Sequence, residues 1–363
     1  MRGKKFFVNL SGRRAGLLLV AALSASLVFS GAAIFIASRD HEIKKDPFVV
    51  APDDRGKASS TFILSALNGL PRANATSAQP VAVVIENHFD ARPLSGVAEA
   101  ALVYEAPVEG GITRLLAFYD PADEVKEIGP VRSARSYFLD WANELEAVFA
   151  HVGGSPAALE LLKTGRPRDL NEYFWGRFFW RSDFRGAPHN VYTSTELIRE
   201  AYDERGFAED WHGSPWRFDD ASSIAATSTA EIVIPFSSAT YTVRWRWDPV
   251  RKIFLRSLGN SAAVDKDGKR ETAQNLAVAF VESRVIDEIG RLKIKTVGTG
   301  DAMMLRDGNP VIGRWEKPSA AERLRFYGPD GEEFVWRPGR TWIEIVPEEV
   351  AVDFNGVRQF SKN

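Results

Sequence analysis

A long uncharged stretch near the N-terminus constrains this chain more than any other feature. Residues 15–38 carry no charged side chain and follow a strongly basic segment, residues 1–14. About 20 apolar residues cross a bilayer as a helix, whereas the apolar part of a cleavable signal peptide is about 7–15 residues long. Basic residues stay on the cytoplasmic side. We therefore expect a single-pass transmembrane signal-anchor in the cytoplasmic membrane, with the body of the chain on the extracytoplasmic side.

The alternative for the same stretch is a cleaved signal peptide. Gly31, Ala32 and Ala33 are small residues of the type found at cleavage sites. Both interpretations export the rest of the chain, so they differ only in whether the membrane remains a partner through the N-terminal helix.

The part after the anchor divides by pattern into a linker and an α/β domain. Residues 39–78 are polar with little periodicity, which predicts a linker. Residues 79–218 alternate strand-like runs with helical ones, including a run that begins at Ser155-Pro156 and ends at Gly165, a typical capped helix. We expect an N-terminal α/β domain here.

The remainder predicts a mostly β domain over residues 232–352, after an Ala/Ser/Thr-rich linker at 219–231. Residues 239–257 alternate polar and apolar side chains around Asp248-Pro249, and Asp307-Gly308-Asn309 is a second hairpin signal. The expected fold is therefore an α/β domain followed by a mostly β domain, behind an N-terminal transmembrane helix.

Charge and cysteine content exclude several classes of function. The formal net charge is only -2, so no overall field attracts nucleic acid, and we expect no nucleic-acid partner. The chain has no cysteine, which excludes disulfides, thiolate chemistry and a lipid-modified cysteine. Any anion site must therefore be built locally.

A helix is expected to start near Ser133, in N-cap position, with Arg132 and Arg135 on its first turn. Cations are disfavoured at that end of the helix dipole, so a nearby anion should compensate them. One hypothesis is a bound anionic ligand in a pocket at strand ends, with the candidate ligand-binding residues Glu86, Asn87, Arg114, Arg132, Ser133 and Arg135. The alternative is that the two arginines only form ion pairs with Glu105 and Glu109.

Catalytic residues are less well indicated. Glu105, Glu109 and His151 are the candidates, because paired carboxylates or a histidine beside glycines can act as acid or base, and carboxylates can hold Mg²⁺. Structural roles for all three are the simpler interpretation. His88, His151 and His189 lack the spacing of a zinc motif, so we expect no metal site and no required cofactor.

The runs "VVIENHFDARPLSG", "VYEAPVEGGITRLLAFYD", "EIGPVRSARSY" and "HVGGSP", with "RWRWDPVRKIFLRS" and "PGRTWIEIVP", resemble the YerB-like lipoproteins of bacteria over about residues 79–350. This resemblance implies a two-domain extracytoplasmic protein, N-terminal α/β and C-terminal β-rich, without an established activity. The chain departs from that family in lacking a lipid-anchoring cysteine. A weaker similarity, to the LytR-CpsA-Psr phosphotransferases, would imply arginines that hold a pyrophosphate.

Two functions from different classes follow from these features. The first is a membrane-anchored cell-envelope binding or scaffolding protein with an anion-recognising cleft, its partner an anionic envelope ligand or a protein. The alternative is a phosphotransferase or hydrolase acting on a phosphorylated or lipid-linked envelope precursor, in which Mg²⁺ is a possible cofactor.

Overall fold

The computed structural model describes residues 63–72, 79–207, 211, 214–220 and 229–359. The expected cytoplasmic segment 1–14, the expected transmembrane segment 15–38 and most of the expected linker 39–78 lie outside these described residues. Among the helices that the structure describes, none has the length and apolar character needed to cross a membrane.

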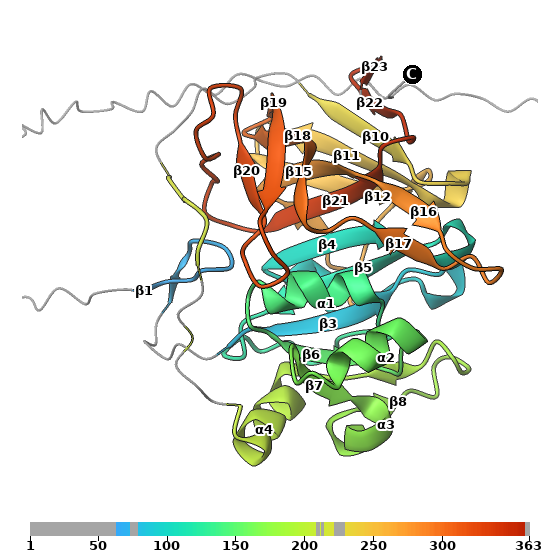
Figure 1. The fold of residues 1–363 in the computed structure, drawn as a ribbon. Helices are drawn as coiled ribbons and strands as arrows, with labels where there is room; N and C mark the ends of the chain where they lie inside the picture. The colour runs from blue at the N-terminus through green and yellow to red at the C-terminus, as the bar shows by residue number, and fades with distance from the viewer. Residues whose placement is uncertain (1–62, 73–78, 208–210, 212–213, 221–228, 360–363) are drawn as a thin grey trace, which may run out of the picture. The chain divides into compact units, whose positions relative to one another are not determined.

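A ten-stranded sheet runs through the described residues, and its central strands are buried on both faces (Figure 1). In spatial order its strands are β20 (Arg325–Tyr327), β19 (Asn309–Lys317), β18 (Gly298–Arg306), β15 (Asn275–Val281), β21 (Thr341–Pro347), β4 (Leu102–Pro107), β5 (Thr113–Tyr119), β3 (Val81–Glu86), β6 (Val148–His151) and β7 (Arg168–Asn171). The expected turn at Asp307-Gly308-Asn309 is confirmed, because it joins β18 to β19.

The same sheet contains strands from both predicted domains. β21, from the C-terminal half, pairs in parallel with β4, from the N-terminal half, and the register places Glu344 beside Glu105. The two halves therefore share backbone hydrogen bonds and do not each close their own sheet.

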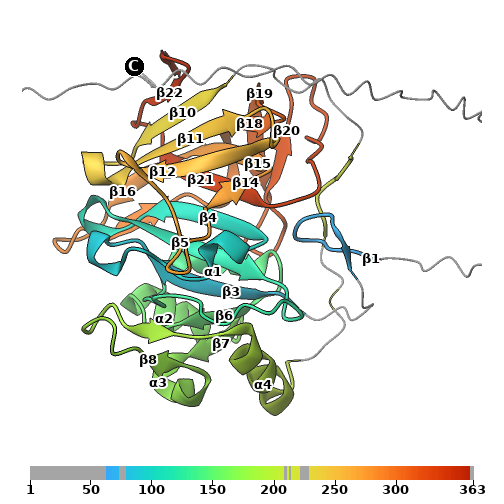
Figure 2. The same cartoon turned by 180° about the vertical axis from the view of Figure 1, so that it is seen from behind.

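A second sheet comes entirely from the C-terminal half and packs against one face of the large sheet (Figure 2). Its strands, in order, are β13 (Ser261–Ala262), β12 (Ile253–Leu258), β11 (Thr242–Asp248), β10 (Glu231–Pro235), β22 (Val352–Phe354) and β23 (Val357–Gln359), and β14 (Thr272–Ala273) also pairs with β12. The predicted hairpin at 239–257 is confirmed as β11 and β12.

The first two helices along the chain cover the opposite face of the N-terminal half, whereas the last two contribute to the core on the side of the second sheet (Figure 1). The described helices are α1 (Ser136–Asn143), α2 (Pro156–Leu162), α3 (Glu172–Trp175) and α4 (Thr195–Arg205). Strand alternation decides the layers: Val81 and Val83 of β3 join the core beneath the second sheet and α4, whereas Ala82 and Val84 join the core beneath α1 and α2.

The remaining described elements are short. They are the two-stranded pairs β1 (Ile63–Leu64) with β2 (Pro71–Arg72), β8 (Trp180–Arg181) with β9 (Val191–Tyr192) and β16 (Ser283–Val285) with β17 (Leu292–Ile294), and the 3-10 turns η1 (Phe89–Ala91), η2 (Val97–Glu99), η3 (Glu109–Gly111), η4 (Gly176–Phe178) and η5 (Ala239–Tyr241).

One helix start was predicted correctly and another was wrong. Ser155 caps α2 as expected, because its side chain accepts the N–H of Ala158 at 3.3 Å. α1, however, begins at Ser136 with Arg135 as N-cap, so Ser133 is not a cap. The backbone N–H of Arg132 instead donates to Val84 and that of Ala134 to Gly153, which holds this segment extended.

Candidate functional site

The segment that carries Arg132 lies where the large sheet divides. β3 and β6 pair in parallel only as far as Val83 and Ala150. Beyond them the extended segment enters between the strands: Arg132 donates its N–H to Val84 at 2.8 Å, and its carbonyl accepts the N–H of Val152 at 3.0 Å. Ligands of α/β proteins commonly bind where neighbouring parallel strands diverge at their carboxyl ends. Arg132 therefore occupies a position typical of a binding site.

The arginine cluster consists of Arg114, Arg132 and Arg135. Arg114 lies at the start of β5, and its Nη1 donates to the carbonyl of Ser133 at 2.7 Å. Nη1 of Arg135 donates to the same carbonyl at 3.3 Å. Ser133 thus contributes its backbone carbonyl to the cluster and does not cap a helix with its hydroxyl group. The structure brings these residues together, although not through the helix cap that the sequence predicted.

Two carboxylates pair with two of these arginines. Arg135 forms a fork with Glu109, with both N–O distances 2.6 Å. Burial raises the pKa of Glu109, but the hydrogen bonds and charge of Arg135 outweigh it, so the net shift is downward. Nε of Arg132 lies 3.0 Å from a carboxylate oxygen of Glu86. The ion-pair alternative had predicted Glu105 as the partner of Arg132. The ion-pair interpretation is therefore right for Arg135 and names the wrong partner for Arg132.

Arg114 differs from its two neighbours. It is 7% exposed, and among the described residues no carboxylate lies within ion-pair distance of it; its Nε has no hydrogen-bond partner there. Burial, together with the charges of Arg135 and Arg132, lowers the pKa of Arg114 to about 10. The cluster therefore contains three guanidinium groups but only two carboxylates that pair with them. The guanidinium group without a carboxylate partner is that of the buried Arg114.

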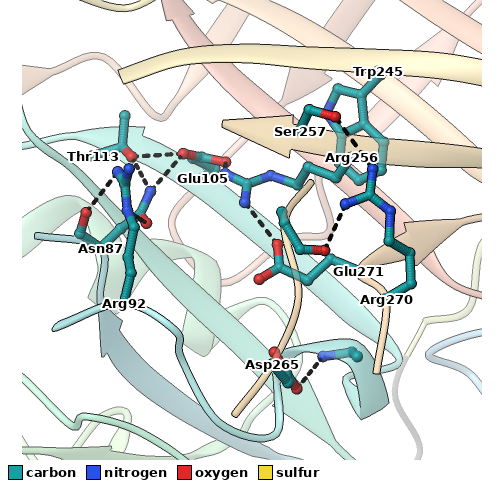
Figure 3. A network of polar contacts seen from close by, with 12 residues as sticks. Asn87, Arg92, Glu105, Thr113, Trp245, Arg256, Ser257, Asp265, Arg270 and Glu271 are labelled. Carbon is teal, nitrogen blue, oxygen red and sulfur yellow. Dashed lines mark hydrogen bonds and ion pairs between the residues drawn. The ribbon is translucent and has the colours of Figure 1, made fainter. Parts of the chain in front are cut away.

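Asn87 and Glu105 belong to a network that joins the two sheets, because Glu105 of β4 accepts a hydrogen bond from Arg256 of β12 (Figure 3). Asn87 donates to Glu105 at 3.2 Å and to Thr113 at 2.7 Å, and its side-chain oxygen accepts from Arg92 at 3.1 Å. Thr113 also donates to Glu105, at 2.6 Å. Because consecutive residues at a strand end point to opposite faces, Glu86 and Asn87 separate although they are neighbours in the sequence.

Glu105 belongs to a buried carboxylate network, defined as Glu105, Arg256, Glu271 and Glu344. Arg256 is fully buried and lies 2.5 Å from Glu105 and 2.7 Å from Glu271. Burial lowers the pKa of Arg256, but the three carboxylates raise it by more. Burial and then the charge of Glu105 raise the pKa of Glu344 well above its ordinary value. Both oxygens of Glu105 accept hydrogen bonds inside the fold, so it is not free to act as a base.

His151 is also committed to the structure. It is fully buried, with Nδ1 2.6 Å from the carbonyl of Gly153 and Nε2 2.8 Å from Asp169. Both ring nitrogens therefore contact protein acceptors. The ring fixes the loop at Gly153, where φ is 58°, and this loop in turn pairs with the segment at Ala134. His151 supports the arginine cluster and offers no free nitrogen to a substrate.

The sequence did not predict several further candidate residues, because the residues they contact are distant along the chain. Nδ1 of His189 lies 2.7 Å from Glu86, and its ring stacks on that of His88. A cavity of about 620 Å³ lies between the halves, lined by residues that include Phe89, Arg92, Arg244 and Glu271. The arginine cluster does not line this cavity. No local motif marks any of these residues.

Comparison with known proteins identifies the family. The chain matches two domain families described as protein of unknown function (DUF3048). The N-terminal domain family matches residues 67–208, and the C-terminal domain family matches residues 232–343. The chain belongs to the DUF3048 family. The resemblance to YerB-like proteins is confirmed by a relative from Bacillus subtilis (strain 168) named "Putative lipoprotein YerB", which is 33% identical over 277 residues, 75% of this chain and 82% of the relative.

A solved structure agrees with this assignment. The crystal structure of YerB from Bacillus subtilis matches with a TM-score of 0.71 and 31% identity, and the match covers 80% of this chain and 99% of that one. Both halves of this DUF3048 chain thus have a counterpart of known fold.

Proposed function

We propose that this DUF3048 protein binds an anionic ligand of the cell envelope through Arg114, Arg132 and Arg135. The observation that carries the proposal is Arg114, a buried arginine without a carboxylate partner among the described residues and beside two further arginines. A buried charge left uncompensated destabilises a fold unless something pairs with it. A bound anion would be that partner.

Two further features favour a phosphate-like group. Guanidinium groups bind phosphate oxygens through paired N–H donors. The N-terminus of α1 adjoins the cluster and has no side-chain cap, because its N-cap residue is Arg135. The N–H of Phe138 donates to the carbonyl of Arg135 at 3.0 Å, whereas those of Ser136 and Tyr137 have no acceptor among the described residues. These two N–H groups are therefore available to an anion, which the helix dipole also favours.

The proposed location is the extracytoplasmic side of the cytoplasmic membrane, with residues 15–38 as a single-pass anchor. Support comes from the absence of charge in that segment and from the name of the relative, a lipoprotein. This chain contains no cysteine to carry a lipid, so the apolar segment would take over the anchoring role.

The test is the variant Arg114→Met in the full chain, purified in detergent. We expect pyrophosphate and a short-chain polyprenyl pyrophosphate to bind the unmodified protein at one saturable site. The variant should bind at least about tenfold more weakly, because a charge-assisted hydrogen bond contributes about 1.5–3 kcal/mol. Its melting temperature should stay the same or rise, since an unpaired buried charge is removed. Calorimetric titration and a thermal melt measure both quantities.

The matched control is Arg314→Met, on β19, where Arg314 pairs with Glu316 at 2.7 Å in a part-exposed position. It should leave anion binding unchanged. A variant at Arg114 that melts several degrees lower and still binds the anion would contradict the proposal and make Arg114 a structural residue.

The phosphotransferase or hydrolase alternative remains a prediction. The carboxylates expected to act in it are engaged elsewhere, Glu105 with Arg256 and Glu109 with Arg135. Repeating the titration with Mg²⁺ and following phosphate release tests it directly: metal-dependent release would favour an enzyme.

A further inference from the structure

A second group of side chains lies next to Glu86. The histidine cluster consists of His88, the residue that precedes η1, Asp90 within η1, and His189, which lies shortly before β9. Each residue offers one metal-ligand atom, and these three atoms lie within 4.8 Å of one another. Tetrahedral zinc with bonds of about 2.0–2.1 Å needs ligand atoms about 3.3 Å apart. Side-chain rotations that move each of the three ligand atoms by about 1 Å would bring them to this separation.

The orientation of His189 matches that of a metal ligand. Glu86 lies 2.7 Å from Nδ1 of His189 and is itself buried, with its other oxygen 3.0 Å from Arg132. Nδ1 is therefore occupied, which leaves Nε2 as the nitrogen that can bind an ion. Metal-binding histidines commonly donate the N–H of their other nitrogen to a carboxylate in this way, and the carboxylate fixes the tautomer and the ring.

His88 and Asp90 complete the set from the other side. The rings of His88 and His189 are stacked with centroids 5.2 Å apart. Nδ1 of His88 lies 3.5 Å from a carboxylate oxygen of Asp90 and accepts the N–H of Asp90 at 3.3 Å, a long contact that restrains the ring weakly. The side chains of His88, Asp90 and His189 are 25%, 55% and 20% exposed, so an ion and a water molecule can reach them.

We propose that His88, Asp90 and His189 bind one divalent transition-metal ion, with Glu86 orienting His189. Two imidazoles and one carboxylate form a donor set that suits Zn²⁺, and three protein ligands leave a fourth position for water. Asp90 supplies the negative charge at the site, because the charge of Glu86 is shared with Arg132. None of the three arginines binds the ion. Arg132 adjoins the site through Glu86, which contacts both Arg132 and His189, whereas Arg114 forms no ion pair with Glu86 among the described residues.

The experiment uses the full chain without an affinity tag, stripped of metal and held in detergent. Calorimetric titration with Zn²⁺ should give one saturable site, and Co²⁺ should produce the visible absorption of a tetrahedral ion. The double variant H88A/H189A should lose both signals. Glu86→Gln should keep the site but weaken Zn²⁺ binding about 10–100-fold, the usual effect of removing an orienting carboxylate.

Two control variants show whether Zn²⁺ binds at the histidine cluster or elsewhere on the chain. Asp330→Ala removes an exposed aspartate that follows β20, an edge strand of the large sheet that lies several strands away from β3, and should leave the titration unchanged. Arg114→Met should also leave Zn²⁺ binding unchanged, so loss of the anion site and loss of the metal site are distinguishable. Saturable Zn²⁺ binding that persists in the double histidine variant, or the absence of any saturable site in the unmodified chain, would overturn the proposal.

Discussion

Replacing Arg256 by methionine is expected to lower the free energy of unfolding by about 3–5 kcal/mol, the usual effect of removing one partner of a buried ion pair. Arg256 is fully buried and contacts both Glu105 and Glu271. In the variant, the buried carboxylates of Glu105 and Glu271 lose the positive charge that pairs with them. The measurement is chemical denaturation of the full chain, read by tryptophan fluorescence, because Trp245 and Trp342 lie close to the network.

Arg251→Met is the matched control, because Arg251 lies in the turn between β11 and β12 on the surface, 69% exposed and 3.9 Å from Asp248. An exposed pair of this kind contributes at most about 1 kcal/mol. Adding Glu105→Gln or Glu271→Gln to Arg256→Met should recover part of the lost stability, since each removes an unpaired charge. Equal stability of the Arg256 and Arg251 variants would mean that the network contributes nothing to folding.

The second large effect is a pH dependence that Asp265 controls. Its Oδ2 accepts the N–H of Ala98 at 2.9 Å, whereas its Oδ1 has no partner among the described residues. Burial, followed by the charge of Glu271, raises the pKa of Asp265 to about 8. The ordinary value for aspartate in an unfolded chain is about 3.9. Between these two values the folded protein holds a proton that the unfolded chain has released.

The sign of the effect follows from that difference. Because the folded state binds more protons, stability falls as pH rises from about 4 to about 8, by up to about 1.4 kcal/mol per pH unit. Asp265→Asn keeps the acceptor for Ala98 and removes the titration. We expect the variant to be about 2–4 kcal/mol more stable at pH 7.5 and nearly unchanged at pH 4.

Denaturation at pH 4.5, 6.0 and 7.5 measures this difference. Asp267→Asn is the control from the same loop: its carboxylate is exposed and hydrogen-bonded to Lys269, which lowers its pKa. That variant should not gain stability at high pH. The raised pKa of Glu344 also makes stability fall as pH rises. Because both variants retain Glu344, this effect is common to them and does not change the comparison. A loss of stability in Asp265→Asn at every pH would show that Asp265 is needed as a charge.

The local elements were the part that sequence reasoning predicted well. α2 follows from Ser155-Pro156, and the two hairpins follow from alternation around turn residues. These signals involve residues within one turn or one hairpin of each other, so local hydrogen bonds and side-chain period decide them. The start of α1 was wrong because Arg132 and Ala134 use their backbone N–H groups for contacts with β3 and with Gly153, which no local pattern reveals.

The site shows the same division. The sequence by itself determined that Arg114, Arg132 and Arg135 belong near strand ends, because the strands and the short segments between them place them there. Only the tertiary structure decided which carboxylate each arginine contacts, that Glu105 pairs with Arg256, that His189 reaches Glu86, and that β21 joins β4 into one sheet. Those pairings join residues far apart along the chain, and their energies depend on burial and distance, which a linear sequence does not contain.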